Sequence, residues 1–303
     1  MLNGRVALVT GAGHGIGRAH ALELAARGAS VVVNDLGSSA SGEGQGRDAD
    51  RVVEIIRERG GTAIADYGDV GDEAQVEAMV ARAFDEFGHL DIVVNNAGIV
   101  RDRAIWNMSV EDFDLVLRVH LRGSWLAGRA VAKRWRAAAK AGDGSVYGRI
   151  VNTTSGAGLQ GNFGQSNYSP AKAALVALTQ TLSLELAGIG VTVNAISPVA
   201  ATRLASGVID GPVLEADERA AGEFDPLDPA LAAPVVAWLA SPEAGHISGQ
   251  VFRVTGEYLA LMSGWEVAAK IPNGGAYWDA SKLGSLVATD LFRTRTAGLR
   301  PGS

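Results

Sequence analysis

Short apolar runs rich in β-branched residues alternate along the chain with longer amphipathic stretches. Two of the runs, Val31–Val33 and Ile92–Val94, are apolar at consecutive positions, which is typical of parallel strands covered by helices on both faces. The alternation of strands and helices predicts an α/β fold with a doubly wound parallel sheet. The predicted strands are Arg5–Thr10, Ser30–Asp35, Thr62–Asp66, Leu90–Asn95, Arg149–Thr154 and Val191–Ile196.

No internal repeat and no Pro- or Ser-rich linker divides the chain, so we expect a single domain over residues 1–255 and a C-terminal extension over 256–303. The Gly- and Ser-rich stretch Gly37–Gly46 and the Ala- and Gly-rich stretch Ala137–Gly148 are expected to be surface loops. Residues Ser263–Ser303 hold five basic and three acidic side chains, on a chain whose net charge is −6. One interpretation of this basic extension is a solvated arm or a subunit contact, which packs on the domain or on a partner subunit. The alternative is a cover over the substrate site that supplies positive charge to an anionic ligand.

The composition narrows the class of protein. With 303 residues, 47% of them apolar and 20% charged, the chain is predicted to be an ordinary folded globule. No apolar run is long enough to span a membrane, and no charged-then-apolar leader precedes the first strand, so we expect neither membrane insertion nor export. The absence of cysteine excludes disulfides and thiolate metal sites, and it fits a cytoplasmic protein. The negative charge argues against nucleic-acid binding and favours a small-molecule partner.

A Gly-rich turn follows the first predicted strand and opens a helix. In Thr10–Gly17, glycines at positions 11, 13, 15 and 17 allow backbone N–H groups and a helix N-terminus to approach a pyrophosphate. Asp35 closes the second strand, where a carboxylate accepts hydrogen bonds from ribose hydroxyls and repels a 2′-phosphate, which predicts NAD as the cofactor. A simple turn residue is the alternative for Asp35. The cofactor-binding residues predicted in this half are Gly11, Gly15, Ile16, Gly17, Asp35, Asp69, Val70, Asn96, Ala97 and Gly98.

The second half of the predicted sheet brings candidate chemistry. Ser155 ends the fifth strand, and Tyr168 and Lys172 lie one helical turn apart on one face of the next helix. Pro170 fits this helix only if it begins near Asn167. The pKa of a free tyrosine, about 10, is too high for a base, but a nearby ammonium and a cationic nicotinamide favour the phenolate. The Tyr–Lys pair is therefore a candidate for proton transfer.

The order and spacing of Thr10–Gly17, Asn95–Gly98, Ser155, Tyr168, Lys172 and Ser197-Pro198 resemble the short-chain dehydrogenase/reductases, over roughly residues 4–255. The resemblance implies a Rossmann-type fold with a seven-stranded sheet and hydride transfer with a nicotinamide cofactor. It implies that Tyr168 is the acid/base, that Lys172 lowers its pKa and holds the nicotinamide ribose, and that Ser155 binds the substrate oxygen. Residues Pro198 to Thr202 would hold the nicotinamide carboxamide, and a substrate loop would follow at about 203–223.

His120 stands where most members of that family have an asparagine that holds a water molecule. A histidine can hold the same water or carry the proton itself, because its pKa lies near neutrality. The alternative is a partly buried histidine with an ordinary structural role. We therefore include His120 among the catalytic candidates, with Ser155, Tyr168 and Lys172.

The segments Val33–Gly37, Arg118–Trp125 and Gly161–Tyr168 resemble more closely the dehydrogenase part of peroxisomal multifunctional enzyme type 2 and its bacterial single-domain relatives, including their histidine. This resemblance implies a 3-hydroxyacyl-CoA dehydrogenase, with a hydroxysteroid (17-beta type) or other bulky secondary-alcohol dehydrogenase as the alternative, and a homodimer or homotetramer. A cofactor-sensing regulator is a further alternative, but it does not need Ser155, Tyr168 and Lys172 together. A scaffold or subunit-interface protein is another, and the intact Gly-rich turn argues against it. Candidate cations for CoA phosphates are Arg101, Arg103, Arg203, Lys270, Lys282, Arg293 and Arg295.

Overall fold

The computed structural model describes residues 1–202, 224–267, 269–275 and 277–287, so the predicted substrate loop at 203–223 lies outside the described residues. The strands are β1 (Val6–Thr10), β2 (Ser30–Asn34), β3 (Thr62–Asp66), β4 (Ile92–Asn95), β5 (Gly148–Thr153), β6 (Val191–Pro198), β7 (Val251–Val254) and β8 (Leu259–Leu261). The helices are α1 (Gly15–Ala26), α2 (Asp48–Glu58), α3 (Glu73–Phe87), α4 (Val110–Leu117), α5 (Gly123–Ala141), α6 (Gly156–Gln160), α7 (Tyr168–Leu186), α8 (Ala233–Leu239) and α9 (Ala280–Leu286). A π-helical turn, Arg118–Arg122, joins α4 to α5.

The eight strands form one sheet in the order β3-β2-β1-β4-β5-β6-β7-β8. All neighbouring strands are parallel except β7 and β8, which pair antiparallel. The six predicted strands are present, and the doubly wound α/β fold is confirmed. The sheet has one strand more than the seven that the family resemblance implied, because the chain turns back after β7 and adds Leu259–Leu261 to its edge.

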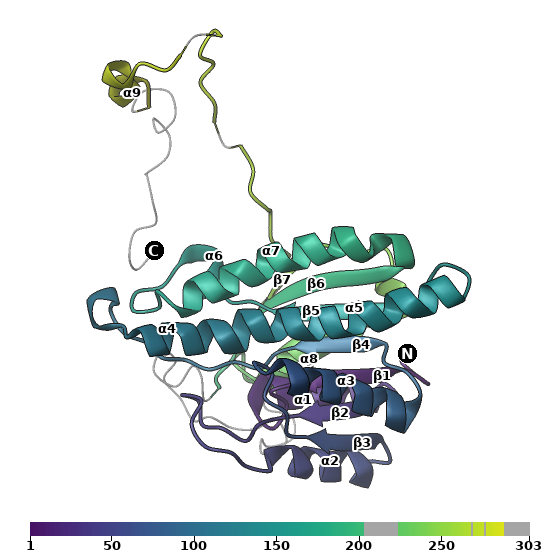
Figure 1. Cartoon of the computed structure of the whole chain (residues 1–303). Helices are drawn as coiled ribbons and strands as arrows, with labels where there is room; N and C mark the ends of the chain where they lie inside the picture. Colours follow the sequence, from purple (N-terminus) through teal and green to yellow (C-terminus); the bar gives the residue numbers. More distant parts are fainter. Residues whose placement is uncertain (203–223, 268, 276, 288–303) are drawn as a thin grey trace. The chain divides into compact units, whose positions relative to one another are not determined.

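Helices cover both faces of the sheet (Figure 1). On one face, α1, α2 and α8 bury apolar side chains against alternate strand positions such as Val9 and Val33. On the other face, α3, α5 and α7 pack on the intervening positions, which include Leu8 and Val32. Because each parallel strand is buried on both sides, its sequence is apolar at consecutive positions.

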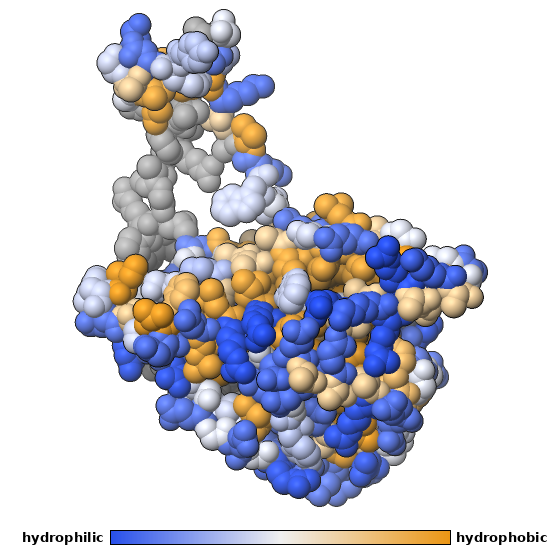
Figure 2. Space-filling model, viewed as in Figure 1, coloured by the Kyte–Doolittle hydropathy of each residue, from blue (hydrophilic) through white to orange (hydrophobic). Residues whose placement is uncertain are grey.

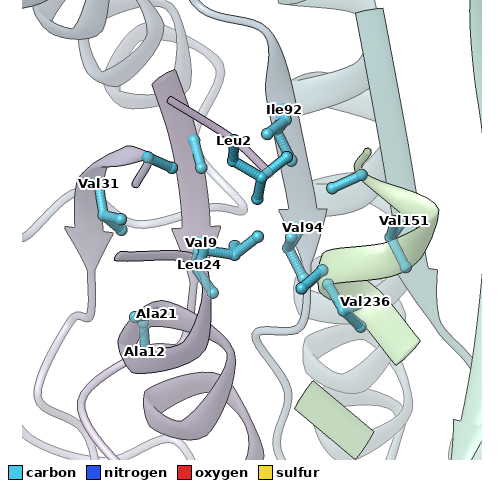
Figure 3. Packing of buried hydrophobic residues seen from close by; sticks show 14 of the residues in the cluster. Leu2, Val9, Ala12, Ala21, Leu24, Val31, Ile92, Val94, Val151 and Val236 are labelled. Carbon is cyan, nitrogen blue, oxygen red and sulfur yellow. The ribbon is translucent and has the colours of Figure 1, made fainter. Parts of the chain in front are cut away.

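The packing between the sheet and the first of these layers is dense. Figure 3 shows Leu24 of α1 and Val236 of α8 directed at Val9 of β1 and Val94 of β4. The side chains of all four residues are completely excluded from solvent. This layer fixes the start of α1 against the end of β1, where the Gly-rich turn lies.

Of the two predicted surface loops, the structure contains one as expected and differs from the prediction at the other. Most residues of Gly37–Gly46 have no regular secondary structure, as expected. The prediction for Ala137–Gly148 is wrong at both ends, because residues up to Ala141 continue α5 and Gly148 begins β5. Alanine favours the helix more than any other residue, so the Ala-rich half of the stretch extends the helix until Gly142.

Residue contacts divide the chain into two compact units, Met1–Met262 and Ser263–Ser303. The first unit extends beyond residue 255 because β8 belongs to its sheet. In the second unit, the Asp279 side chain caps α9 by accepting a hydrogen bond from the Ser281 backbone N–H. None of the helices in the described parts of the chain is long and apolar enough to cross a membrane.

Candidate active site

A pocket of about 790 Å³ lies at the carboxyl ends of the parallel strands. Ligands of doubly wound sheets bind at this edge, beside the point where the strand order reverses. Here the reversal lies between β1 and β4. All the residues that the sequence predicted for the cofactor or the chemistry line this pocket: Gly11, Gly15, Ile16, Gly17, Asp35, Asp69, Val70, Asn96, Ala97, Gly98, His120, Ser155, Tyr168, Lys172, Pro198 and Thr202.

The Gly-rich turn approaches the loop after β4 so closely that side chains do not fit. Gly11 has a φ of 61°, and a Cβ atom there would lie 2.6 Å from the Cα of Ala97. A Cβ on Gly17 would overlap the carbonyl oxygen of Gly11. Helix α1 begins at Gly15, and its first three residues line the pocket. The partial positive charge of a helix N-terminus suits a phosphate, so the turn fits the pyrophosphate of a dinucleotide.

Asp35 lies at the end of β2 with both carboxylate oxygens engaged. Oδ2 accepts a hydrogen bond of 2.7 Å from the Gly13 backbone N–H, and Oδ1 accepts one of 2.7 Å from Gly37. The carboxylate thus ties the Gly-rich turn to the loop that follows β2, and each oxygen keeps a second lone pair for a ribose hydroxyl. Arg47, the nearest downstream base, points elsewhere, since its guanidinium binds Asp50 and the hydroxyl of Tyr67.

Polar side chains hold the other cofactor-side strands in register. Asn96 donates from Nδ2 to the carbonyl oxygens of Thr10 and Gly11, at 3.1 and 3.0 Å. Asn95 donates to Asn152 Oδ1 at 2.8 Å and joins β4 to β5, which is the structural role expected for an asparagine at this position. A Cβ on Gly15 would lie 3.4 Å from Cγ2 of Thr202, so the segment after Pro198 passes close to the Gly-rich turn.

Ser155, Tyr168 and Lys172 meet where β5, α6 and α7 come together. Tyr168 is the first residue of α7, and the Asn167 side chain caps the helix by accepting a hydrogen bond from the Tyr168 N–H, as the position of Pro170 predicted. Lys172 is buried, and its Nζ donates to the Thr153 carbonyl oxygen at 2.7 Å. The same Nζ lies 5.5 Å from the centre of the Tyr168 ring.

Burial sets the protonation of this pair. It raises the pKa of Tyr168 to about 12, although a hydrogen bond with Ser155 opposes the shift. Burial also lowers the pKa of Lys172 to about 7. Loss of solvent disfavours both the phenolate and the ammonium in the ligand-free protein, and the role of Lys172 in lowering the tyrosine pKa stays a prediction for the cofactor-bound enzyme.

His120 is completely buried within the π-helical turn. Its Nε2 lies 2.8 Å from the carbonyl oxygen and 3.1 Å from the amide nitrogen of Ile99, and its ring meets the Tyr168 ring edge-on at 5.1 Å. Burial, together with the charge of Lys172, lowers the pKa of His120 well below its usual value, so the imidazole is neutral at physiological pH. Nδ1 has no hydrogen-bond partner within the described part of the chain. This arrangement suits a neutral imidazole that holds a water molecule better than one that carries a proton.

Two of the proposed cations for CoA phosphates flank the pocket but do not line it. Arg101 forms ion pairs with Asp112 at 2.8 Å and Glu43 at 3.3 Å, and its Nε donates to the Ser41 carbonyl oxygen. Arg103 donates to the neighbouring Asp102 carbonyl oxygen and does not line the pocket. Arg203, Arg293 and Arg295 are outside the described residues, and Lys270 and Lys282 belong to the second unit.

Sequence reasoning missed Arg253 of β7, which lines the pocket. The signal was a single charged residue within the apolar run Val251–Val254. It also missed the connection between Arg101 and the tyrosine helix, where Asn167 Nδ2 donates to the Arg101 carbonyl oxygen at 2.9 Å.

Comparisons with known proteins agree with this geometry. The family described as enoyl-(acyl carrier protein) reductase matches residues 11–258. A crystal structure of a short chain dehydrogenase from Mycobacterium avium is 46% identical, with a TM-score of 0.87 over 100% of this chain and 99% of that one. The chain belongs to the short-chain dehydrogenase/reductase family.

The sequence of this chain is 44% identical to that of hydroxyacyl-CoA dehydrogenase ChsB1 of Mycobacterium tuberculosis, over 93% of this chain and 87% of that protein. It is also 44% identical to mouse peroxisomal multifunctional enzyme type 2, over 87% of this chain but only 33% of that longer protein. The predicted family and the enzyme class, an oxidoreductase whose fold implies a nicotinamide cofactor, are thereby confirmed.

Proposed function

We propose that the enzyme oxidises a 3-hydroxyacyl-CoA to the 3-ketoacyl-CoA with NAD as the hydride acceptor. The observation that carries this proposal is the convergence of Ser155, Tyr168 and Lys172 on the same pocket as Asp35 and the Gly-rich turn. The names of the relatives, hydroxyacyl-CoA dehydrogenase and peroxisomal multifunctional enzyme type 2, support the substrate class.

The Gly-rich turn and Asp35 would hold the cofactor, which would supply the hydride acceptor and, when oxidised, a positive charge at the site. That charge opposes the effect of burial on Tyr168 and favours the phenolate as the proton acceptor. Ser155 holds the substrate oxygen against the tyrosine hydroxyl. Lys172 positions the tyrosine and the cofactor ribose, and His120 holds a water molecule through which the site exchanges protons with solvent.

The preference for NAD rests on Asp35. A 2′-phosphate would meet its carboxylate in a largely desolvated position, since Asp35 is only 9% exposed. Arg47, the nearest downstream base, does not compensate for this charge, because it is paired with Asp50. A carboxylate in this position favours a ribose diol over a ribose phosphate.

We also propose a cytoplasmic homodimer or homotetramer. The cysteine-free sequence suits a reducing compartment. Figure 2 shows apolar side chains gathered over α5 and α7, and Leu184 of α7 is 81% exposed. Exposed apolar surface on such helices is typical of subunit contacts.

The test is a screen of NAD reduction with purified enzyme across 3-hydroxyacyl-CoA chain lengths and a set of hydroxysteroids. We expect the highest kcat/KM for an acyl-CoA. Faster turnover of a free hydroxysteroid than of any acyl-CoA would replace this substrate class with the hydroxysteroid alternative. Equal use of NAD and NADP would contradict the assigned cofactor.

A further inference from the structure

Arg253 places a cationic side chain in the active-site pocket from an unexpected element, the short strand β7. Side chains alternate along this strand: Phe252 and Val254 enter the apolar core beneath one face of the sheet, and Arg253 lies on the other. Its strand neighbours are Ser197 of β6 and Ala260 of β8, both small residues.

The guanidinium lies against the residue that follows Ser155. A Cβ atom on Gly156 would be only 2.8 Å from Nη1 of Arg253, so the glycine provides the space that the arginine occupies. The guanidinium therefore lies against the residue that follows, one position along the chain, the serine that holds the reacting oxygen.

Arg253 differs from the other basic groups of the pocket in having nothing to bind. Arg118 is paired with Asp69 at 2.6 Å, His14 with Asp48 at 3.2 Å, and Lys172 donates to Thr153. Among the residues that the structure describes, Arg253 has neither a hydrogen-bond partner nor an ion pair for its side chain. A partly buried guanidinium with five N–H donors and no acceptor is a binding group for oxygen.

We infer that Arg253 binds a second oxygen of the substrate, the thioester carbonyl, while Ser155 and Tyr168 hold the oxygen that reacts. This inference rests on the proposed function. In a 3-hydroxyacyl thioester the two oxygens are carried by C3 and C1, which a single carbon separates, so they match two binding groups that are adjacent in the site. The CoA phosphates do not match, because the full pantetheine arm separates them from C3. Arg253 is thus a specificity-determining residue that selects alcohols with a neighbouring carbonyl.

The experiment compares two substrates that differ only at C1. The first is 3-hydroxybutyryl-CoA, and the second is its thioether analogue, in which a methylene replaces the C1 carbonyl. In Arg253→Gln we expect kcat/KM for the thioester to fall about 10- to 100-fold, which corresponds to about 1.4 to 2.8 kcal/mol at 1.4 kcal/mol per factor of ten. The kcat/KM of the thioether, or its inhibition constant where turnover is slow, should change less than twofold. Arg253→Lys should recover part of the loss.

Gly156→Ala is the matched variant, because it displaces the guanidinium without removing its charge. The added methyl meets the far end of a flexible side chain, so we expect a folded protein and the same selective loss on the thioester. The dissociation constant of NADH, measured by fluorescence, should remain unchanged in all variants.

Three outcomes would overturn the inference: an equal loss on thioester and thioether, no loss on either, or weaker NADH binding that accounts for the loss. A third substrate is the N-acetylcysteamine thioester, which lacks the CoA phosphates. If Arg253→Gln affects the CoA substrate but not this short thioester, the arginine binds phosphate and the carbonyl assignment is wrong. A wild-type enzyme that oxidises no 3-hydroxyacyl thioester would instead refute the proposed function itself.

Discussion

The substitution Asp35→Asn separates the charge of the cofactor-selecting carboxylate from its structural role. The carboxylate accepts backbone hydrogen bonds from Gly13 and Gly37, both of 2.7 Å. Asp35→Ala would remove both acceptors, each worth about 1.5–3 kcal/mol for a charged group, and would disturb the turn itself. Asparagine keeps the shape and one acceptor oxygen while it removes the negative charge.

The expected change in cofactor preference follows from Coulomb's law. At a separation of about 5 Å and an effective dielectric constant of about 20, a unit charge on Asp35 opposes each charge of a 2′-phosphate by about 3 kcal/mol. Removing it should therefore raise the ratio of kcat/KM for NADP to that for NAD by roughly 100-fold or more. Loss of one backbone acceptor should lower the melting temperature by a few degrees.

The assay is steady-state kinetics with both cofactors, accompanied by thermal unfolding to show that the variant is folded. Glu54→Gln provides the control, because it removes one charge from the exposed face of α2. A folded Asp35→Asn enzyme with the wild-type preference, or a Glu54→Gln enzyme with the same shift, would refute the assignment of selectivity to Asp35.

Four further predictions concern the chemistry and the extension. Tyr168→Phe should lower kcat about 10²- to 10⁴-fold with NADH binding retained, and single-turnover kinetics that keep the wild-type rate would remove Tyr168 as the acid/base. Between pH 7 and 10 the free energy of unfolding of the ligand-free enzyme should rise by about 3–5 kcal/mol relative to that of Lys172→Met. The reason is that the lysine of the unfolded chain is protonated in this range, whereas the buried lysine, with its pKa of about 7, is not. Urea unfolding at several pH values measures this difference, and the same pH dependence in both proteins would contradict it. His120→Asn should stay active and His120→Leu should lose most activity, whereas equal rates in both variants would return His120 to a purely structural role. Truncation after Gly264 should raise the KM for acyl-CoA and reduce its dependence on salt if the extension meets the phosphates, and an unchanged KM in the shortened enzyme would exclude that contact.

Local sequence patterns were sufficient for most of the fold and for the Gly-rich turn, whereas His120 and the segment from Pro198 to Thr202 were predicted only from the family resemblance. The strand–turn–helix order around Gly11 and the four-residue spacing of Tyr168 and Lys172 depend on backbone geometry within one element or one connection. Such features are visible without knowledge of the tertiary contacts. The same holds for the start of α7, which Pro170 restricts to the position where Asn167 caps it.

Features that depend on distant contacts could not be predicted. Arg101 was assigned to CoA phosphates because it follows β4, but Asp112 and Glu43 reach it from elsewhere and neutralise it. Arg253 gave no motif, and its place beside Gly156 exists only after β6 and β7 have paired. The direction of the Tyr168 pKa shift depends on burial, which spacing alone does not reveal.

The packing of His120 against Gly98 restricts the order in which this pocket can accumulate mutations. A Cβ atom on Gly98 would overlap Cε1 of the imidazole, and a shift of the buried ring would disturb its edge-on contact with Tyr168. Gly98→Ala is therefore harmful in this background and becomes tolerable only after His120→Asn has shortened the side chain. As long as position 120 is a histidine, position 98 therefore has to remain glycine. The two positions are coupled, and a substitution at position 120 has to precede one at position 98.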